Sequence, residues 1–391
     1  TRVRSSAASD VYKRQALHKA TEQRGATGLS HGDLSRSIFD AMELRFDSYA
    51  ADPEVRGPAR TATNDALRRV IDYYLYRDLQ RGWRVTAPNL EDCGLLHFEY
   101  DGLLGNDGLL AEAELWGTGF SVRHGRGEEQ FIETPAALRE SSAETREEIL
   151  RTLLDVMRRA LALKVDALDP QRQLDLVEQT KPRLLEGTVW YLEDARELTK
   201  AEVAYPRSRR QQDRTGFFLS SYGAFGRYLK RRLAPQAPRL TRDDIDTIIR
   251  FLLFVLKRYG IVEQVRSGHD GDDPGYQINA DALRWLPGDG AIRPVDRTRL
   301  IEAGEIPPEV NRYFVECYRG FVDLKGVLEA REHTAQVAAE DREEREERFR
   351  SGDLPLLFCS PTMELGVDIA QLNLVNLRNV PPTPANYAQR S

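Results

Sequence analysis

Apolar side chains recur every three or four residues along much of this chain, which is the spacing of amphipathic helices. The clearest stretch is 241–259, whose apolar stripe comprises Ile245, Ile248, Ile249, Leu252 and Leu256. Thr241 and Asp244 stand at capping-box positions, and Gly260 follows the helix end. The same spacing predicts helices in 63–81 and in 142–168. Most of the chain is therefore expected to be α-helical.

Two strand-like segments follow the 241–259 helix. Residues 261–265 and 276–279 are separated by a Gly/Asp-rich loop, which is the helix-then-hairpin order of a winged helix. We therefore expect a winged-helix-like module at 236–290. Its acidic loop tip disfavours insertion into a DNA groove and favours a structural role. Residues 16–60 predict a helix-turn-helix-like unit, with a helical hairpin that does not contact nucleic acid as an equal alternative, because the segment lacks a basic face.

The pattern changes towards the C-terminus. Residues 356–359 form a short, continuous apolar run that is typical of a buried parallel strand. Ser360 and Pro361 then supply a helix cap followed by proline at the first helical position, so the strand is expected to end in a loop that opens a short helix. Such a geometry can hold phosphates, because backbone amides at a helix N-terminus attract anions.

The residues around that strand are more specific than its geometry. SPTMELGVDI (360–369) followed by NVPPTPANYAQR (379–390) resembles motif V and the opening of motif VI in the second RecA-like domain of superfamily 2 helicases. Upstream, REHTAQ (331–336) and the charged run at 342–349 resemble the phosphate-contacting strand end and helix that precede motif V. The resemblance implies a mostly α chain with a partial α/β RecA-like domain, of the P-loop NTPase type, at 291–391.

The resemblance also implies roles for individual residues. Asp368 would meet the ATP ribose or couple it to the nucleic-acid strand. Gly366 is the second implied cofactor-binding residue, and its amide would contact the nucleic-acid backbone. Gln389 and Arg390 would approach the triphosphate as catalytic residues. The residues implied to contact the nucleic-acid backbone are His333, Thr334, Ser360 and Thr362. The implied cofactors are ATP and Mg²⁺, with the Mg²⁺ ligands in the first RecA-like domain, and the implied partner is nucleic acid, expected to be DNA.

Two signatures of a first RecA-like domain are missing from the sequence. No Gly-rich loop ends in Gly-Lys-Ser/Thr and no Asp-Glu dipeptide occurs, so a Walker A loop and a DExx magnesium site are absent. The resemblance thus implies half of an ATP-dependent helicase or translocase, inactive by itself, whose partner is the first RecA-like domain of the same protein. The alternative is a non-enzymatic nucleic-acid-binding adaptor, with winged-helix parts and a degenerate RecA-like remnant.

A further segment, GWRVTAPNLEDCGLL (82–96), is similar to one in large bacterial helicases, including those associated with DISARM phage defence. In them a long insertion interrupts the second RecA-like domain, which implies that most of 16–310 is insertion, with a helical part at 61–235. Defence- or repair-system partners are expected for such a protein.

The two ends of the sequence indicate a fragment. SDVYKRQ (9–15) resembles the translated frame of a common sequencing adapter, so residues 1–15 are expected to be a disordered scar, with a flexible basic arm as the alternative. At the other end, Ser391 stands where the superfamily continues with further arginines.

Arginines alternate with aromatic residues through 205–233, where Asp213 is the only acid. Arg207, Arg209 and Arg210 are expected to neutralise phosphates, and aromatic faces can stack on unpaired bases. The alternative is an amphipathic helix whose aromatics enter the core and whose arginines are solvated.

Composition adds only a little to these predictions of fold and function. With 391 residues we expect roughly two to four domains, and the net charge of -6 means that any basic surface is local. The three cysteines stand far apart, which fits a reducing cytosol, and His97 and His124 lack partners at ligand spacing, so no metal site is expected. No apolar run approaches the roughly 20 residues of a membrane span. We therefore expect a cytoplasmic protein with no membrane partner.

Overall fold

A computed structural model of the chain describes residues 2–80, 88–105, 107–124, 128–206, 217–268, 273–299, 309–320, 330–334, 337–354 and 356–359. The chain divides into two compact units. The larger comprises nearly all residues up to Arg319, and the smaller begins at Gly320. The sequence predicts a C-terminal domain that begins at 291, whereas the structural division comes later in the sequence. No described helix is both long and apolar enough to cross a membrane.

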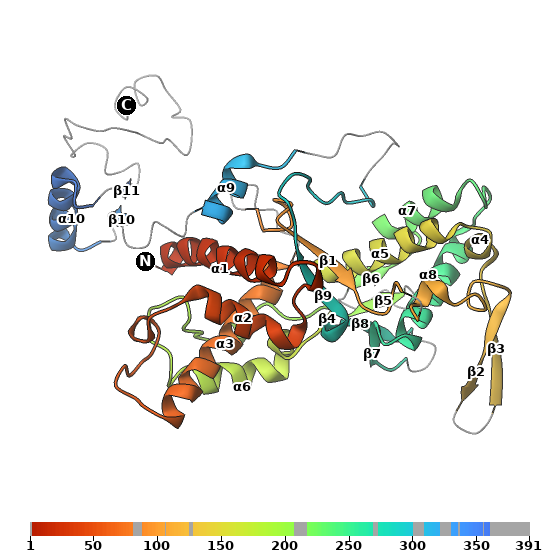
Figure 1. Cartoon of the computed structure of the whole chain (residues 1–391), viewed down its shortest axis with the longest axis horizontal. Helices are drawn as coiled ribbons and strands as arrows, with labels where there is room; N and C mark the ends of the chain where they lie inside the picture. The colour runs from red at the N-terminus through yellow and green to blue at the C-terminus, as the bar shows by residue number, and fades with distance from the viewer. Residues whose placement is uncertain are drawn as a thin grey trace, which may run out of the picture. The chain divides into compact units, whose positions relative to one another are not determined.

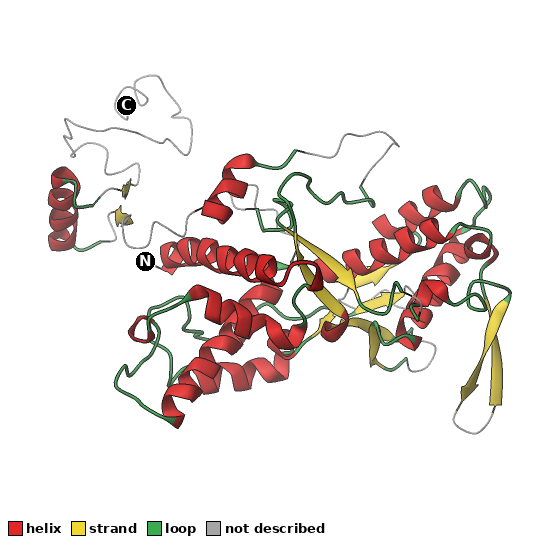
Figure 2. Ribbon diagram, in the orientation of Figure 1, coloured by secondary structure: helices red, strands yellow, loops and turns green. Residues whose placement is uncertain are grey.

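Helices are the predominant regular elements of the larger unit (Figures 1 and 2). They are α1 (Arg2–Arg24), α2 (His31–Met42), α3 (Pro58–Asp78), α4 (Ala136–Arg139), α5 (Ala143–Arg159), α6 (Pro170–Thr180), α7 (Ala224–Leu233), α8 (Arg242–Arg258) and α9 (Arg312–Gly320). Helix α8 buries eight apolar side chains and begins with the capping box of Thr241 and Asp244, as its sequence predicts. Helix α5 ends earlier than predicted, where Leu161 adopts a left-handed φ of 60° and the chain turns into a strand.

The strands of the larger unit form two sheets and a separate hairpin. β1 (Leu96–Tyr100) pairs antiparallel with β9 (Leu283–Pro287). The five-stranded sheet contains β4 (Leu163–Lys164), β5 (Ala204–Pro206), β6 (Phe217–Leu219), β7 (Val262–Arg266) and β8 (Gly275–Asn279), in the order β4-β8-β5-β6 with β7 beside β8. The hairpin joins β2 (Gly119–His124) to β3 (Glu128–Glu133).

The helix-then-hairpin order predicted for 236–290 is present, because α8 is followed by the antiparallel pair β7–β8. β8 also pairs with β4 and β5, and β9 pairs with β1, so this region shares both sheets with residues before 236. The region is therefore not a separate structural unit, and its identification as a winged helix stays a prediction.

Trp285 on β9 is the largest fully buried side chain in the described part of the larger unit, and it is 1% exposed. Its ring meets Tyr76 of α3 edge-on at 5.7 Å and Phe98 of β1 at 5.0 Å between centroids. Its backbone N–H donates to the Leu29 carbonyl at 3.0 Å, and the Leu29 N–H donates back at 2.8 Å. Residues from each of the predicted insertion modules thus share one core, which explains why their boundaries are not visible as separate units.

Residues 1–15 differ from the expectation of disorder. Helix α1 runs continuously from Arg2 to Arg24, and Lys13, Arg14 and Gln15 are each 5% exposed. Arg14 binds Asp78 of α3 through Nε and Nη2 at 2.9 and 2.8 Å. Lys13, Arg14 and Gln15 are therefore packed against the larger unit, because a charged segment can be ordered by a paired carboxylate. The adapter-like origin of the sequence stays a prediction.

The described part of the smaller unit is a strand–helix–strand segment. β10 (Ala330–His333) pairs in parallel with β11 (Leu356–Cys359), and α10 (Ala339–Ser351) connects them. Gly352, at a φ of 85°, ends α10 in the left-handed region that favours glycine. The sequence predicts both a parallel strand at 356–359 and a charged helix before it. The strand is not buried as predicted, because Leu356 and Phe358 are 44% and 56% exposed.

Candidate functional site

The carboxyl edge of β10 and β11 is where the smaller unit can meet a ligand. The register places His333 opposite Cys359, the last residue of each strand, so the chain leaves both strands at the same edge. In open α/β sheets, ligands bind outside the carboxyl ends of parallel strands. Thr334 follows β10 there and is half-buried, and the chain continues from Cys359 into Ser360.

Helix α10 is attached to β10 through polar contacts. His333 Nε2 donates to Oε1 of Glu346 at 2.5 Å, while its Nδ1 has no hydrogen-bond partner within the part of the chain that the structure describes. Arg345 Nη1 donates to the Glu332 carbonyl at 2.8 Å. These contacts fix the direction in which β10 presents Thr334.

The expected phosphate contact of His333 stays a prediction. In the described part of the chain its side chain is fully buried and hydrogen-bonded to α10. Thr334 is thus the better placed of the two for a nucleic-acid contact. The acidic residues Glu340 and Asp341 occupy the first turn of α10, which disfavours phosphate binding at that N-terminus.

Most predicted site residues lie outside the described residues. This holds for the six residues of the motif V and VI segment, namely Ser360, Thr362, Gly366, Asp368, Gln389 and Arg390. It also holds for Arg207, Arg209 and Arg210. Their expected roles therefore stay predictions, and the strand edge that precedes Ser360 is the part that the structure describes.

The aromatic residues on α7 differ in exposure from the one in the turn before it. Phe225 and Tyr228, on α7, are 3% and 4% exposed and stack on each other in the core. Tyr222, in the turn before α7, is 53% exposed. The core interpretation therefore holds for α7, but Tyr222 is available at the surface.

The segment 88–95, which lies within the helicase-like GWRVTAPNLEDCGLL, is held by a buried ion pair that sequence reasoning missed. Arg158 of α5 is fully buried and donates to both carboxylate oxygens of Glu91 at 2.9 and 2.7 Å. Arg159 donates to the same carboxylate at 2.6 Å. Burial alone would raise the pKa of Glu91, but the two guanidinium groups outweigh it and hold that pKa at about 2.

Close backbone contact fixes the end of the same segment. A Cβ at Gly94 would lie 2.4 Å from the carbonyl oxygen of Ile292, and Gly94 has a φ of 67°. Gly290 N–H donates to the Gly94 carbonyl at 2.9 Å. Tyr318 of α9 donates its hydroxyl to the Pro88 carbonyl at 2.7 Å. The segment is therefore a structural junction that joins α3, α5 and α9.

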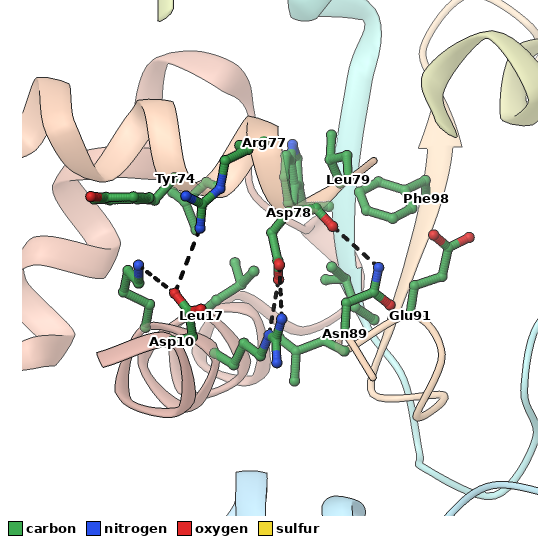
Figure 3. Close-up of a pocket in the computed structure, with 15 residues that line it drawn as sticks. Asp10, Leu17, Tyr74, Arg77, Asp78, Leu79, Asn89, Glu91 and Phe98 are labelled. Carbon is green, nitrogen blue, oxygen red and sulfur yellow. Dashed lines mark hydrogen bonds and ion pairs between the residues drawn. The ribbon is translucent and has the colours of Figure 1, made fainter. Parts of the chain in front are cut away.

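A small cavity next to this junction has no room for a nucleotide. Its lining includes Asp78, Asn89, Glu91 and Phe98 (Figure 3). Its volume of about 30 Å³ can hold roughly two water molecules. Asn89 Nδ2 crosses it to donate to the Asp78 carbonyl at 3.2 Å. The polar groups at this cavity are thus used within the fold.

The described side chains offer neither a metal centre nor a reactive thiol in the core. No group of three or more His, Cys, Asp or Glu in the described ranges is placed to hold a metal ion. Burial raises the pKa of the Cys93 thiol to about 12 and also raises that of Cys317. Both thiols are therefore protonated at neutral pH.

Comparison with known proteins finds a helicase-like segment at the C-terminal end of the sequence. The family described as "Helicase conserved C-terminal domain" matches residues 313–391. The chain is also 45% identical to the Druantia protein DruE of Escherichia coli (strain UMEA 4076-1), over 16% of this chain and 4% of that protein. The chain thus corresponds to a small part of the length of this relative. No solved structure matches.

Proposed function

We propose that the chain supplies the second RecA-like half of an ATP-dependent nucleic-acid motor, because residues 313–391 match the helicase conserved C-terminal domain family. The family match is the observation that carries the proposal. The parallel pair β10–β11 with its connecting helix α10 supports it, because that arrangement is part of an α/β sheet of the RecA type.

The strand edge supports the assignment of nucleic-acid contacts. Thr334 follows β10, and Ser360 and Thr362 follow β11 in the sequence, so hydroxyl groups occur after both parallel strands. Hydroxyls and backbone amides are common donors to phosphate oxygens. We propose that these three residues orient the nucleic-acid backbone along this edge.

The nucleotide contacts are proposed for the segment after β11. Asp368 and Gly366 would hold the ribose side of ATP, and Gln389 and Arg390 would position charge beside the triphosphate. ATP, when bound with Mg²⁺, supplies the free energy for movement along the strand. Positioning and charge stabilisation account for most of the catalysis in phosphoryl transfer, which is why an arginine is central to the proposal.

The test compares the chain with its full-length parent. We expect no nucleic-acid-stimulated ATP hydrolysis from the chain alone, and stimulated hydrolysis from the parent. Asp368→Ala or Arg390→Ala in the parent should each remove most of that activity, with a loss on the order of a thousandfold for the arginine. Arg350→Ala is the matched control, because Arg350 lies in the last turn of α10 and pairs with Glu346 and Glu347 at 3.4 and 3.7 Å.

Other outcomes contradict the proposal. A folded Asp368→Ala parent with unchanged turnover would reject the motif V assignment. A parent that binds nucleic acid but hydrolyses no ATP would support the adaptor alternative. ATP turnover by residues 16–391 alone would show that the nucleotide site is complete within this chain.

The similarity to large bacterial helicases of phage defence supports a defence role for the parent protein. We expect a strain that carries the parent to reduce phage plating, and the Asp368→Ala strain to lose that reduction. Equal plating in both strains would favour repair or another process.

A further inference from the structure

An exposed aromatic side chain stands in a rigid turn of the larger unit. Tyr222 lies between β6 and α7 and is 53% exposed, whereas Phe225 and Tyr228, three and six residues later, are buried. Exposing an aromatic ring of this size forgoes the free energy of burying it. The exposure of Tyr222 therefore suggests that its ring has a function at the surface.

The turn that carries Tyr222 is fixed by both neighbouring helices. Gly223 N–H donates to the Ser220 carbonyl at 2.9 Å, and a Cβ at Gly226 of α7 would lie 2.3 Å from that same oxygen. Asp246 of α8 accepts from the Ser221 N–H at 2.7 Å and from its hydroxyl at 3.2 Å. The ring is thus presented from a preorganised backbone, which lowers the entropy cost of binding.

Two arginines are attached to Tyr222. The guanidinium of Arg242 lies over the ring, 4.3 Å from its centroid, and Nη1 donates to the tyrosine hydroxyl at 2.6 Å. Arg227 Nη1 donates to the Tyr222 carbonyl at 2.6 Å. Tyr222, Arg227 and Arg242 come from the turn, α7 and α8, and we call these three residues the Tyr222 platform.

The sequence that contains the platform is basic overall, although acids occur next to Arg242. Residues 205–242 contain ten basic side chains and one acid, Asp213. Three aspartates follow Arg242 at the start of α8. Asp244 is used in the capping box with Thr241, Asp246 holds Ser221, and Asp243 is exposed. Lys230 is exposed one turn along α7 from Arg227 and adds to the positive side.

We propose that the Tyr222 platform binds single-stranded nucleic acid, with an unpaired base stacked on the tyrosine ring and adjacent phosphates at Arg227 and Arg242. Aromatic rings stack on any base, and arginines neutralise the backbone, so the site selects a single strand without reading its sequence. A duplex hides its base faces within its own stack. This site lies in the larger unit, so it goes beyond the motor function proposed for the C-terminal domain.

The test is fluorescence anisotropy of the full chain with a labelled oligothymidylate, at several salt concentrations. Tyr222→Ala should weaken binding roughly tenfold, and Tyr222→Phe should bind nearly as the unmodified chain does, because the ring is retained. Arg227→Ala should reduce the salt slope by about 0.7, as expected for one lost phosphate contact on a single strand. Lys257→Ala is the charge-matched control, since Lys257 is exposed near the end of α8 and bonds Gln264 at 2.6 Å.

Several results would overturn the proposal, once circular dichroism has shown that each variant is folded. These are absence of oligothymidylate binding, equal binding by Tyr222→Ala, an equal loss in Lys257→Ala, and equal competition by a duplex or by a polyglutamate peptide. The parent protein separates this proposal from the motor function. Tyr222→Ala should keep ATP turnover at saturating nucleic acid, whereas Asp368→Ala should keep platform binding and lose turnover.

Discussion

Helices α8 and α10 represent the two units and differ in how they are held. Of the 17 residues of α8, eight are buried apolar side chains, whereas none of the 13 residues of α10, all of them described, is buried. Helix α10 is attached through His333–Glu346 and Arg345–Glu332 instead. Helix α8 is thus held by apolar packing, whereas α10 is held by polar contacts to β10. Stability and motor activity should therefore respond to different substitutions.

The largest stability effect is expected at the buried ion pair of the larger unit. Glu91→Gln removes the buried carboxylate that Arg158 contacts twice and leaves it only the carboxylate of the half-buried Asp155, at 3.2 Å, which should cost about 3–5 kcal/mol in the free energy of unfolding. Urea denaturation measures this cost. The control is Asp101→Asn, whose partner Arg284 lies on the surface, and it should change stability by less than about 1 kcal/mol. Equal effects of the two variants would contradict the role given to burial.

The ion pair of Glu91 and Arg158 should also make the free energy of unfolding depend on pH. The pKa of Glu91 in the folded chain, about 2, is lower than the ordinary value for a glutamate. The ion pair therefore stabilises the folded chain fully at pH values above the ordinary pKa of a glutamate. This stabilisation is lost as the pH falls from that pKa towards 2. Urea denaturation between pH 7 and pH 3 should show this loss in the unmodified chain and a weaker one in Glu91→Gln.

An intermediate effect is expected from deletion of residues 1–15. The deletion removes Arg14 from Asp78 and also removes the bond from Gln15 Nε2 to the Cys317 carbonyl, at 2.8 Å. Loss of such buried hydrogen bonds should cost about 1–3 kcal/mol and lower the melting temperature. A melting temperature within error of the full chain would instead support the disordered scar that the sequence predicts.

The smallest effect is expected in the smaller unit. Glu346→Ala removes the partner of the buried His333 ring, at a local cost of about 1–2 kcal/mol. Hydrogen exchange should accelerate in α10 and β10 while urea unfolding of the larger unit is unchanged. Glu347→Ala, at a side chain that is 77% exposed, should change neither. If Glu346→Ala also shifted the urea midpoint of the larger unit, the separation of the two units would be refuted.

The sequence predicts those features whose signals are local. The capping box of α8, its apolar stripe, the β7–β8 hairpin and the strand at 356–359 all depend on neighbouring residues, and all are present. The sharing of both sheets by 236–290 and earlier residues could not be predicted in this way, because β1 and β9 lie nearly two hundred residues apart. Pairings of that kind depend on the whole fold.

The same contrast holds for individual side chains. Arg158, in the last turn of α5, has the sequence position of a solvated arginine, yet its partner Glu91 is 67 residues away. The motif position of His333 predicts a phosphate contact, but it does not predict that the ring is buried and bonded to Glu346 of the following helix. For Asp368 and Arg390 the prediction depends on the motif alone. Their position after β11 is consistent with the strand edge that the structure describes.

The attachment of α9 determines where the two units can be separated experimentally. The helicase match begins at residue 313, inside α9, but Val315, Cys317 and Tyr318 of that helix are buried in the core of the larger unit. A truncation at the family boundary would therefore leave an apolar gap on one fragment and an exposed apolar stripe on the other. A cut after Arg319 would leave each fragment with its own buried side chains, so soluble expression should favour it.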